Sequence, residues 1–188
     1  MSPCDAPYVC PAEHAGWLST PIRKLVTNPA RILRGLVRPG DTAVDLGCGP
    51  GFFTLPLAAM VGDGGSVIAV DLQAAMLERV AARAERAGLA ARIRLHRCAA
   101  ESLGLDGERA DFALAFWMVH EVPDAEHLLG EASGLLEPEG RLLLVEPRGH
   151  VRADAWARTL DVARGAGFIL TGEPRVALSR AALLQRRT

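Results

Sequence analysis

Two short apolar runs that each carry an acidic residue most constrain what this chain can fold into. The first is Val44–Gly51 (VDLGCGPG), and the second, Val67–Asp71 (VIAVD), follows at the distance of one helical crossover. Continuous apolar runs of this length are typical of buried parallel strands. The alternate glycines of the first run lack the side chains that would keep a ligand away from the backbone. Asp71 is placed to accept two ribose hydroxyl protons, so the pair predicts a nucleotide-like ligand.

Strand-like and helical segments alternate along the rest of the chain. The expected strands are Thr42–Leu46, Ser66–Asp71, Ile93–Arg97, Ala110–Phe116 and Arg141–Glu146. The expected helices are Pro29 to about Val37, Gly51–Val61, Gln73–Ala87, Asp124–Leu136 and Arg152–Arg164. Two final strand-like runs, Phe168–Thr171 and Val176–Leu184, have no helix between them and must pair antiparallel. The pattern predicts a doubly wound α/β sheet that ends in an antiparallel pair.

Length and charge exclude several classes of protein. With 188 residues, 49% of them hydrophobic, the chain can bury one core but not two ordinary ones. The net charge of −1 gives no electrostatic footprint for nucleic acid. No apolar run approaches the ~20 residues that span a bilayer, and the first residues lack a signal-peptide core. We therefore expect one domain in a cytoplasmic protein, with no membrane span and no nucleic-acid partner.

The glycine spacing discriminates between two nucleotide-like ligands. A pyrophosphate loop has the spacing G-x-G-x-x-G, whereas here Phe52 occupies the place of the third glycine. Its ring is expected to crowd the helix N-terminus where a pyrophosphate binds. Asp45 adds a negative charge that suits a cationic amino group better than phosphates. A nicotinamide-dependent oxidoreductase, which also lacks a Tyr-x-x-x-Lys pair here, is therefore disfavoured relative to a protein that binds S-adenosylmethionine.

The segment Val44–Thr54 (VDLGCGPGFFT) resembles motif I of the class I S-adenosylmethionine-dependent methyltransferases, especially the small-molecule group similar to ubiquinone/menaquinone C-methyltransferases. The resemblance covers residues 40–186 and includes Cys98–Leu103, Asp111–Phe116, His120–Asp124 and Leu136–Gly140. It implies a Rossmann-like, seven-stranded sheet of order 3-2-1-4-5-7-6 with strand 7 antiparallel. It also implies S-adenosylmethionine as cofactor and S-adenosylhomocysteine as product.

The same resemblance assigns residues to the cofactor. They are Asp45, Gly47, Cys48, Gly49, Asp71, Leu72, Ala99, Ala100 and Phe116. Asp45 is expected at the ammonium group, Asp71 at the ribose and Leu72 on the adenine. The two glycines and the Phe116 backbone would face the methionine part, and Ala99 and Ala100 would edge the adenine. The family often has an acid where Ala99 stands, so adenine contacts there must come from the backbone, Glu101 or water.

The acceptor side is expected after the fourth strand. His120 and Glu121 follow that strand, and ligands bind at the carboxyl edge of open α/β sheets. His120 could accept a proton from the nucleophile near neutral pH, and Glu121 could bind a cationic group or orient the imidazole. In the alternative, His120 caps the loop and Glu121 faces solvent. Arg148 and His150, after the fifth strand, could also shape this pocket.

The proline-rich residues 1–30 are predicted to form an arm or lid over a methyltransferase domain, residues 31–188. Tyr8, Cys10, His14 and Trp17 are its candidate site residues. The favoured function is in-line methyl transfer to a small-molecule acceptor by a monomer or weak homodimer, with no metal assigned. Two alternatives remain: a metalloid or thiol methyltransferase that uses Cys4, Cys10 and His14, and a protein that binds S-adenosylmethionine without turnover. All four cysteines, including Cys48 and Cys98, lack zinc-like spacing and are expected as free thiols.

Overall fold

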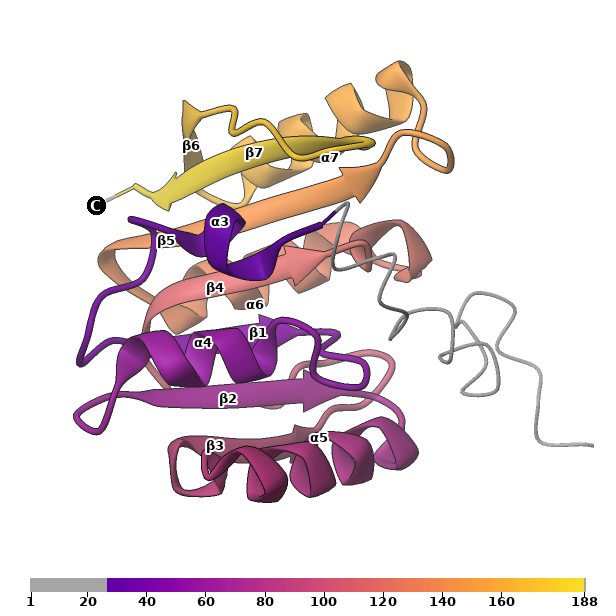
Figure 1. Cartoon of the computed structure of the whole chain (residues 1–188). Coiled ribbons are helices and arrows are strands. Elements are labelled where there is room, and N and C mark those ends of the chain that lie inside the picture. Colours follow the sequence, from indigo (N-terminus) through magenta and orange to yellow (C-terminus); the bar gives the residue numbers. More distant parts are fainter. Residues whose placement is uncertain (1–26, 188) are drawn as a thin grey trace, which may run out of the picture.

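Seven strands form one mixed sheet in the computed structural model, which describes residues 27–187 (Figure 1). The strands are β1 Thr42–Leu46, β2 Ser66–Asp71, β3 Ile93–Arg97, β4 Ala110–Phe116, β5 Leu136–Pro147, β6 Phe168–Gly172 and β7 Ser179–Arg186. Their order across the sheet is β3-β2-β1-β4-β5-β7-β6. The first five are parallel, whereas β7 runs antiparallel to both of its neighbours. The predicted fold class, strand order and antiparallel seventh strand are confirmed.

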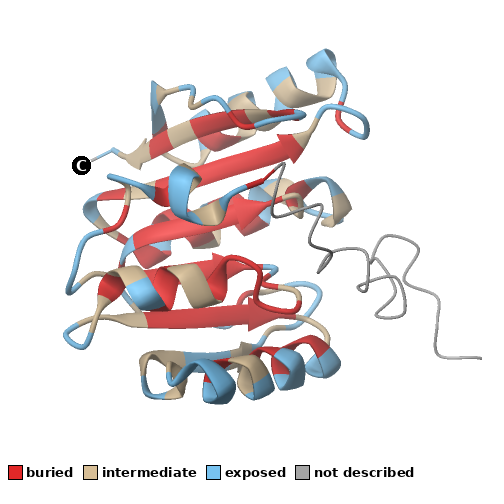
Figure 2. Cartoon of the chain, in the orientation of Figure 1, coloured by how far each residue is buried: buried red, intermediate tan, exposed pale blue. Residues whose placement is uncertain are grey.

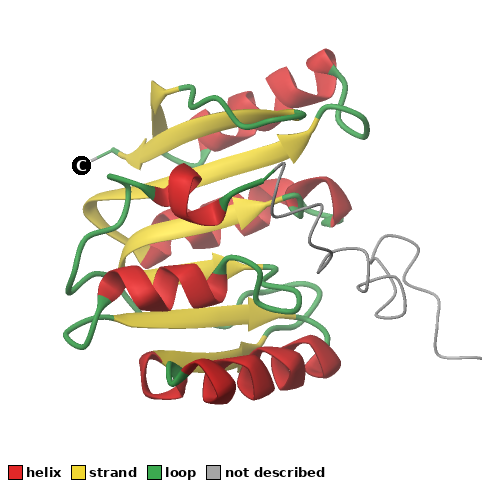
Figure 3. Ribbon diagram, in the orientation of Figure 1, coloured by secondary structure: helices red, strands yellow, loops and turns green. Residues whose placement is uncertain are grey.

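Helices cover both faces of this sheet (Figure 3). The α-helices are α3 Pro29–Leu33, α4 Thr54–Val61, α5 Ala74–Ala87, α6 Ala125–Leu135 and α7 Ala153–Gly165, and two 3₁₀ turns are η2 Ala90–Arg92 and η3 Val119–Glu121. Successive strand residues point to opposite faces. Ala43 of β1 therefore packs in one core cluster with Leu57 of α4, and Val44 in the other with Leu129 of α6. The central strands are buried along their length (Figure 2), as their continuous apolar runs predict.

The boundaries of several helices and strands differ from the predicted ones at positions where a glycine or a turn interrupts the element. The first helix ends at Leu33, not near Val37, because Gly35 adopts a left-handed φ of 76°. The helix expected from Gly51 begins at Thr54, because Gly51 closes a turn by donating to the Cys48 carbonyl at 3.1 Å. Strand β5 begins at Leu136 rather than Arg141, since the preceding segment also pairs with β4 across a register shift. Strand β7 begins only at Ser179.

The predicted arm, residues 1–30, lies almost wholly outside the described residues, and so do Cys4, Tyr8, Cys10, His14 and Trp17. Residues 27–30 of the arm are described, and among them the Asn28 side chain accepts from the backbone N–H of Arg31 at 3.2 Å and caps α3. Within residues 27–187, no helix has the length and apolarity needed to cross a membrane.

A close approach of Gly65 to Asp41 and to the end of α4 makes this glycine sensitive to substitution. A Cβ atom there would lie 2.5 Å from the Asp41 carbonyl oxygen and 2.6 Å from Cβ of Val61. We expect Gly65→Ala to lower the free energy of unfolding by about 1–3 kcal/mol, the usual cost of overpacking, as measured by urea denaturation. Gly64→Ala is the matched control, because its Cβ would meet nothing closer than Cα of Gly40 at 3.9 Å. Equal stability of the two variants would contradict the prediction.

Candidate functional site

The carboxyl ends of the parallel strands meet at one edge of the sheet, to the right in Figure 1. Backbone hydrogen bonds join the segments that leave these ends: Cys48 donates to the Val70 carbonyl at 2.9 Å, and Cys98 to the Asp71 carbonyl at 3.2 Å. A Cβ atom on Gly47 would lie 3.0 Å from that of Met118, so the loop after β1 touches the segment after β4. The strand ends that carry the predicted site residues are therefore contiguous at this edge.

The three glycines of the loop after β1 differ in what a side chain at each position would contact. All have positive φ: 64° at Gly47, 51° at Gly49 and 82° at Gly51. A Cβ on Gly51 would lie 3.0 Å from Leu55 and 3.2 Å from Val80, so this residue allows close packing against α4 and α5. By contrast, a Cβ on Gly49 would meet no atom within 4 Å. Gly49 therefore leaves the loop backbone open on the side where a ligand could lie.

Asp71 holds this open loop to the end of β2. Its carboxylate accepts the backbone N–H of Gly49 at 2.8 Å and that of Gln73 at 2.9 Å. The side chain is buried, and this burial raises the pKa of Asp71, although the two N–H donors oppose the effect. The geometry brings Gly49 and Asp71 together, as the sequence predicts. A carboxylate with two further lone-pair sites lies beside the exposed backbone of the loop.

Asp45 lies beneath the loop rather than on its surface. It is only 2% exposed, and its Oδ2 accepts a 2.6 Å hydrogen bond from the hydroxyl of Thr54, the first residue of α4. The loop is also held from α5, where Arg83 donates to the carbonyl of Pro50. These contacts fix the negative charge of Asp45 next to the glycine loop without placing a side chain over Gly49.

These residues fit S-adenosylmethionine, the cofactor that the sequence resemblance implies. The open face of Gly49 can take a ligand against the backbone, and the Asp71 carboxylate beside it suits hydroxyl donors. Leu72 is half-buried, with its carbonyl bonded to Arg97 Nε at 3.2 Å, and Ala99 and Ala100 are exposed after β3. The small side chains of Ala99 and Ala100 leave the carboxyl edge of the sheet accessible at this point.

Two predicted residues have roles in packing. Cys48 is buried, and its burial together with the charges of Asp45 and Asp71 strongly raises the pKa of its thiol. Burial also raises the pKa of Cys98. Both described cysteines are free, and a raised thiol pKa suits packing rather than ligation of a soft metal. Within residues 27–187, no group of three or more His, Cys, Asp or Glu side chains could hold a metal ion.

The structure places the ring of Phe52 in the core. Its ring is 5% exposed and lies in the core, edge-on to Phe53 with the ring centroids 5.3 Å apart. Its ring therefore packs beside the N-cap residue of α4, Phe53, within the core. The packing role of the missing third glycine is performed by Gly51. Phe53 in turn packs on Phe116, the predicted cofactor residue at the end of β4, with the ring centroids 4.3 Å apart.

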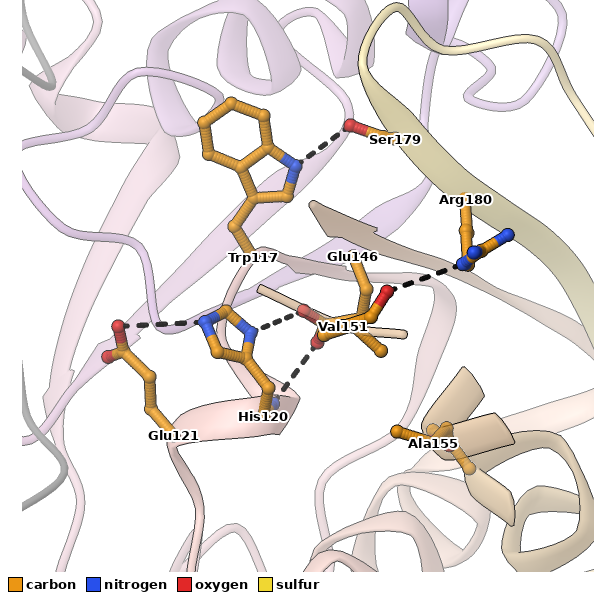
Figure 4. Close-up of polar contacts among 9 residues, drawn as sticks. Trp117, His120, Glu121, Glu146, Val151, Ala155, Ser179 and Arg180 are labelled. Carbon is orange, nitrogen blue, oxygen red and sulfur yellow. Dashed lines mark hydrogen bonds and ion pairs between the residues drawn. The ribbon is translucent and has the colours of Figure 1, made fainter. Parts of the chain in front are cut away.

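His120 lies in η3, directly after β4, with its imidazole between two carboxyl groups (Figure 4). Its Nδ1 is hydrogen-bonded to Oε2 of Glu146, and its backbone N–H donates to Oε1 of the same residue at 3.2 Å. Oε1 of Glu121 lies 3.9 Å from Nε2. Burial lowers the pKa of His120, but the hydrogen bond and charge of Glu146 and the charge of Glu121 outweigh it, so the pKa lies above 6.5.

Glu146 is the residue that the sequence reasoning missed. It was expected only as the end of a strand, whereas the structure places its carboxyl group, 1% exposed, directly on His120. A signal was present, because the apolar run of β5 ends in an acid just as the run of β2 ends in Asp71. The carboxyl group in contact with Nδ1 of the imidazole is therefore that of Glu146, whereas Glu121, the residue that the sequence suggested for orienting the ring, lies on the Nε2 side.

Two further side chains complete the surroundings of this pair. The ring of His150 lies 5.7 Å from that of His120, edge to face. Trp117 has a φ of 59°, which is rare for a bulky residue, and its indole N–H donates to Ser179 Oγ at 3.0 Å (Figure 4). Arg148, also expected near the pocket, donates from Nε to the carbonyl of the same Ser179 at 3.0 Å.

Comparison with known proteins identifies the domain. A family profile described as "Methyltransferase domain" matches residues 44–144. A demethylmenaquinone methyltransferase of Lactobacillus johnsonii is 33% identical over 110 residues, which cover 58% of this chain and 45% of the relative. An uncharacterized 37.1 kDa protein in transposon TN4556 of Streptomyces fradiae is 37% identical over 113 residues, covering 58% of this chain and 31% of the relative.

Solved structures match over more of the chain. A SAM dependent methyltransferase from Aquifex aeolicus superposes with a TM-score of 0.83 at 21% identity, covering 94% of this chain and 98% of that one, and therefore supports the fold. The chain spans less than half the length of the curated relatives named above. Since the family profile nevertheless matches more than half of its 188 residues, the chain belongs to the methyltransferase-domain family and has the fold of the class I S-adenosylmethionine-dependent methyltransferases.

Proposed function

We propose that this chain transfers the methyl group of S-adenosylmethionine, in line, to a small-molecule acceptor at the carboxyl edge of the sheet. The observation that best supports this proposal is the position of the Asp71 carboxylate, which two backbone N–H groups hold beside the open face of Gly49. The name of the curated relative, a demethylmenaquinone methyltransferase, supports a small-molecule acceptor. When bound, the cofactor supplies a methyl group made electrophilic by its sulfonium sulfur.

The residues proposed to hold the cofactor come from four strand ends. They are Asp45, Gly47, Cys48, Gly49, Asp71, Leu72, Ala99, Ala100 and Phe116. Asp71 accepts the ribose hydroxyl protons, and Asp45 supplies negative charge for the ammonium group from beneath the loop. The contribution of these residues is alignment, because an in-line displacement depends chiefly on holding the reacting atoms in a near-attack geometry and excluding water.

His120 is the proposed proton acceptor on the acceptor side. Its Nδ1 is engaged by Glu146, so Nε2 is the nitrogen left to receive a proton from the acceptor. Glu121, 3.9 Å from Nε2, can bind a cationic group of the acceptor. The methyltransferase domain of this proposal comprises residues 31–188. The proposed active form is a monomer or a weak homodimer.

Ligand-induced thermal stabilisation tests the cofactor part of this proposal. S-adenosylhomocysteine at about 100 times its dissociation constant should add about 2.7 kcal/mol, or about 5–10 °C in the unfolding midpoint of a chain of this size. Gly49→Ala should lose most of this shift, since its methyl group would fill the open face of the loop. Small molecules added with saturating S-adenosylhomocysteine, and then assayed for turnover, identify the acceptor.

Gly88→Ala is the matched control for backbone strain. Gly88 caps α5 with a φ of 67°, and its Cβ, like that of Gly49, would meet no atom within 4 Å. Both variants should therefore lose about 1–2 kcal/mol through the left-handed conformation. Only Gly49→Ala should lose the response to S-adenosylhomocysteine. A wild-type protein that shows no shift, or a Gly49→Ala protein that shows the full shift, would overturn the cofactor assignment.

A further inference from the structure

A buried carboxyl group at the end of β5 needs a physical explanation. Glu146 is 1% exposed, and an ionised carboxylate in such a place costs several kcal/mol unless it is paired and hydrogen-bonded. Its neighbours along β5, Leu144 and Val145, are fully buried and apolar. Strand β5 pairs with β4 on one side and β7 on the other, so this strand end lies inside the sheet and not at its margin.

Both oxygens of this carboxyl group are directed at one residue. Oε1 accepts the backbone N–H of His120 at 3.2 Å, and Oε2 accepts its ring Nδ1–H. Two N–H donors from the same residue fix both the position of η3 and the rotation of the imidazole. An acceptor at Nδ1 also selects the tautomer of a neutral histidine, because the proton must then be on Nδ1 and the lone pair on Nε2.

We propose that Glu146 is a positioning residue that holds His120 in the Nδ1–H tautomer, so that Nε2 is the proton-accepting atom of the site. The inference rests on the proposed function, because it concerns the base of that same reaction. The inference also narrows the class of acceptor to molecules whose reacting atom carries a proton, because only these need a base.

The proton and electron balance of the step follows from this arrangement. The acceptor atom forms a bond to the methyl carbon as the bond from that carbon to sulfur breaks, and the electron pair of the broken bond stays on sulfur. The acceptor's proton passes to Nε2 of His120. The resulting imidazolium lies against the Glu146 carboxylate, whose charge stabilises it. One positive charge is present before and after the step.

Other ionisable groups around His120 come from three segments. Glu121 of η3 faces Nε2 at 3.9 Å, and His150, from the segment after β5, packs edge to face on the ring. Arg180 of β7 is the cross-strand neighbour of Glu146, and its Nε donates to the Val151 carbonyl at 3.4 Å (Figure 4). Glu146 is the group in hydrogen-bonding contact with Nδ1, whereas Glu121 is on the opposite side of the ring. The two glutamates can therefore be separated experimentally.

The experiment is a pH titration of the five histidines by two-bond ¹H–¹⁵N NMR on the full chain, with His120 assigned from a His120→Gln spectrum. In the wild type, neutral His120 should be protonated on Nδ1. Glu146→Gln should lower the pKa of His120 and increase the population of the Nε2–H tautomer. Glu121→Gln should lower the pKa but leave the proton on Nδ1. Glu126→Gln, exposed on α6, is the control that should change neither property.

Each outcome supports or overturns the inference. A wild-type His120 in the Nε2–H tautomer would overturn it, even if Glu146→Gln fails to fold. An unchanged tautomer and pKa in a folded Glu146→Gln protein would also overturn it. Glu146→Asp, which retains the charge with a shorter reach, should give intermediate behaviour. The same samples report the thermal shift with S-adenosylhomocysteine, so failure of the proposed function appears as a missing shift and failure of this inference as a wrong tautomer.

Discussion

Asp71→Ala is expected to weaken S-adenosylhomocysteine binding at least 100-fold, which makes it one of the two largest effects predicted for this chain. The carboxylate lies beside the open face of Gly49 and can accept two ribose hydroxyl protons there. Hydrogen bonds to a charged acceptor are worth about 1.5–3 kcal/mol each, and a tenfold change in affinity is about 1.4 kcal/mol. Isothermal titration calorimetry of wild type and variant measures the loss directly.

The same substitution also removes the acceptor for two backbone N–H groups, those of Gly49 and Gln73. Asp71→Asn separates these effects, because it retains the size of the side chain and one acceptor oxygen but not the charge. We expect it to fold and to bind with an intermediate affinity. Asp161→Ala removes an exposed carboxylate on α7 and should leave the affinity unchanged. A folded Asp71→Ala protein with wild-type affinity would contradict the assignment.

His120→Gln is expected to lower the rate of methyl transfer by about 10²–10⁴-fold, the usual contribution of a positioned base. The affinity for S-adenosylhomocysteine should remain that of the wild type, because His120 lies on the acceptor side. Single-turnover kinetics with the acceptor identified by the turnover screen separates chemistry from binding. His127→Gln is the matched control, since His127 is exposed on α6 and pairs only with nearby Glu131 among the ion pairs of the described residues.

The pH dependence gives a second measure of the same residue. A base must be neutral, so the rate should rise with pH through the pKa of His120, which lies above 6.5 because of Glu146 and Glu121. The sign for stability is opposite. A histidine with a raised folded-state pKa contributes stability that is fully present below 6.5 and is lost as pH rises through the folded value. A pH–rate profile that is flat in the wild type, or unchanged in His120→Gln, would contradict the role of His120 as base.

Local patterns predicted most of the elements because the relevant information lies within a few residues. Continuous apolar runs are typical of strands buried on both faces, and the strands so predicted are present. The boundaries were less well predicted, since residues such as Gly35 and Gly51 take left-handed conformations that end or delay a helix. The strand order came from the family resemblance and not from periodicity, because pairing between strands depends on the whole chain.

The sequence by itself determined the methyl donor side of this protein: the glycine spacing and the acids at two strand ends are local features. Only the tertiary structure decided the surroundings of the candidate base. Glu146 and His120 are separated by 26 residues and meet because β4 and β5 are parallel neighbours whose carboxyl ends coincide. Likewise Phe52 was assigned to the ligand loop by its position in the motif, whereas packing placed its ring in the core. Burial and register across the sheet are long-range properties, and they set which carboxylate orients the histidine.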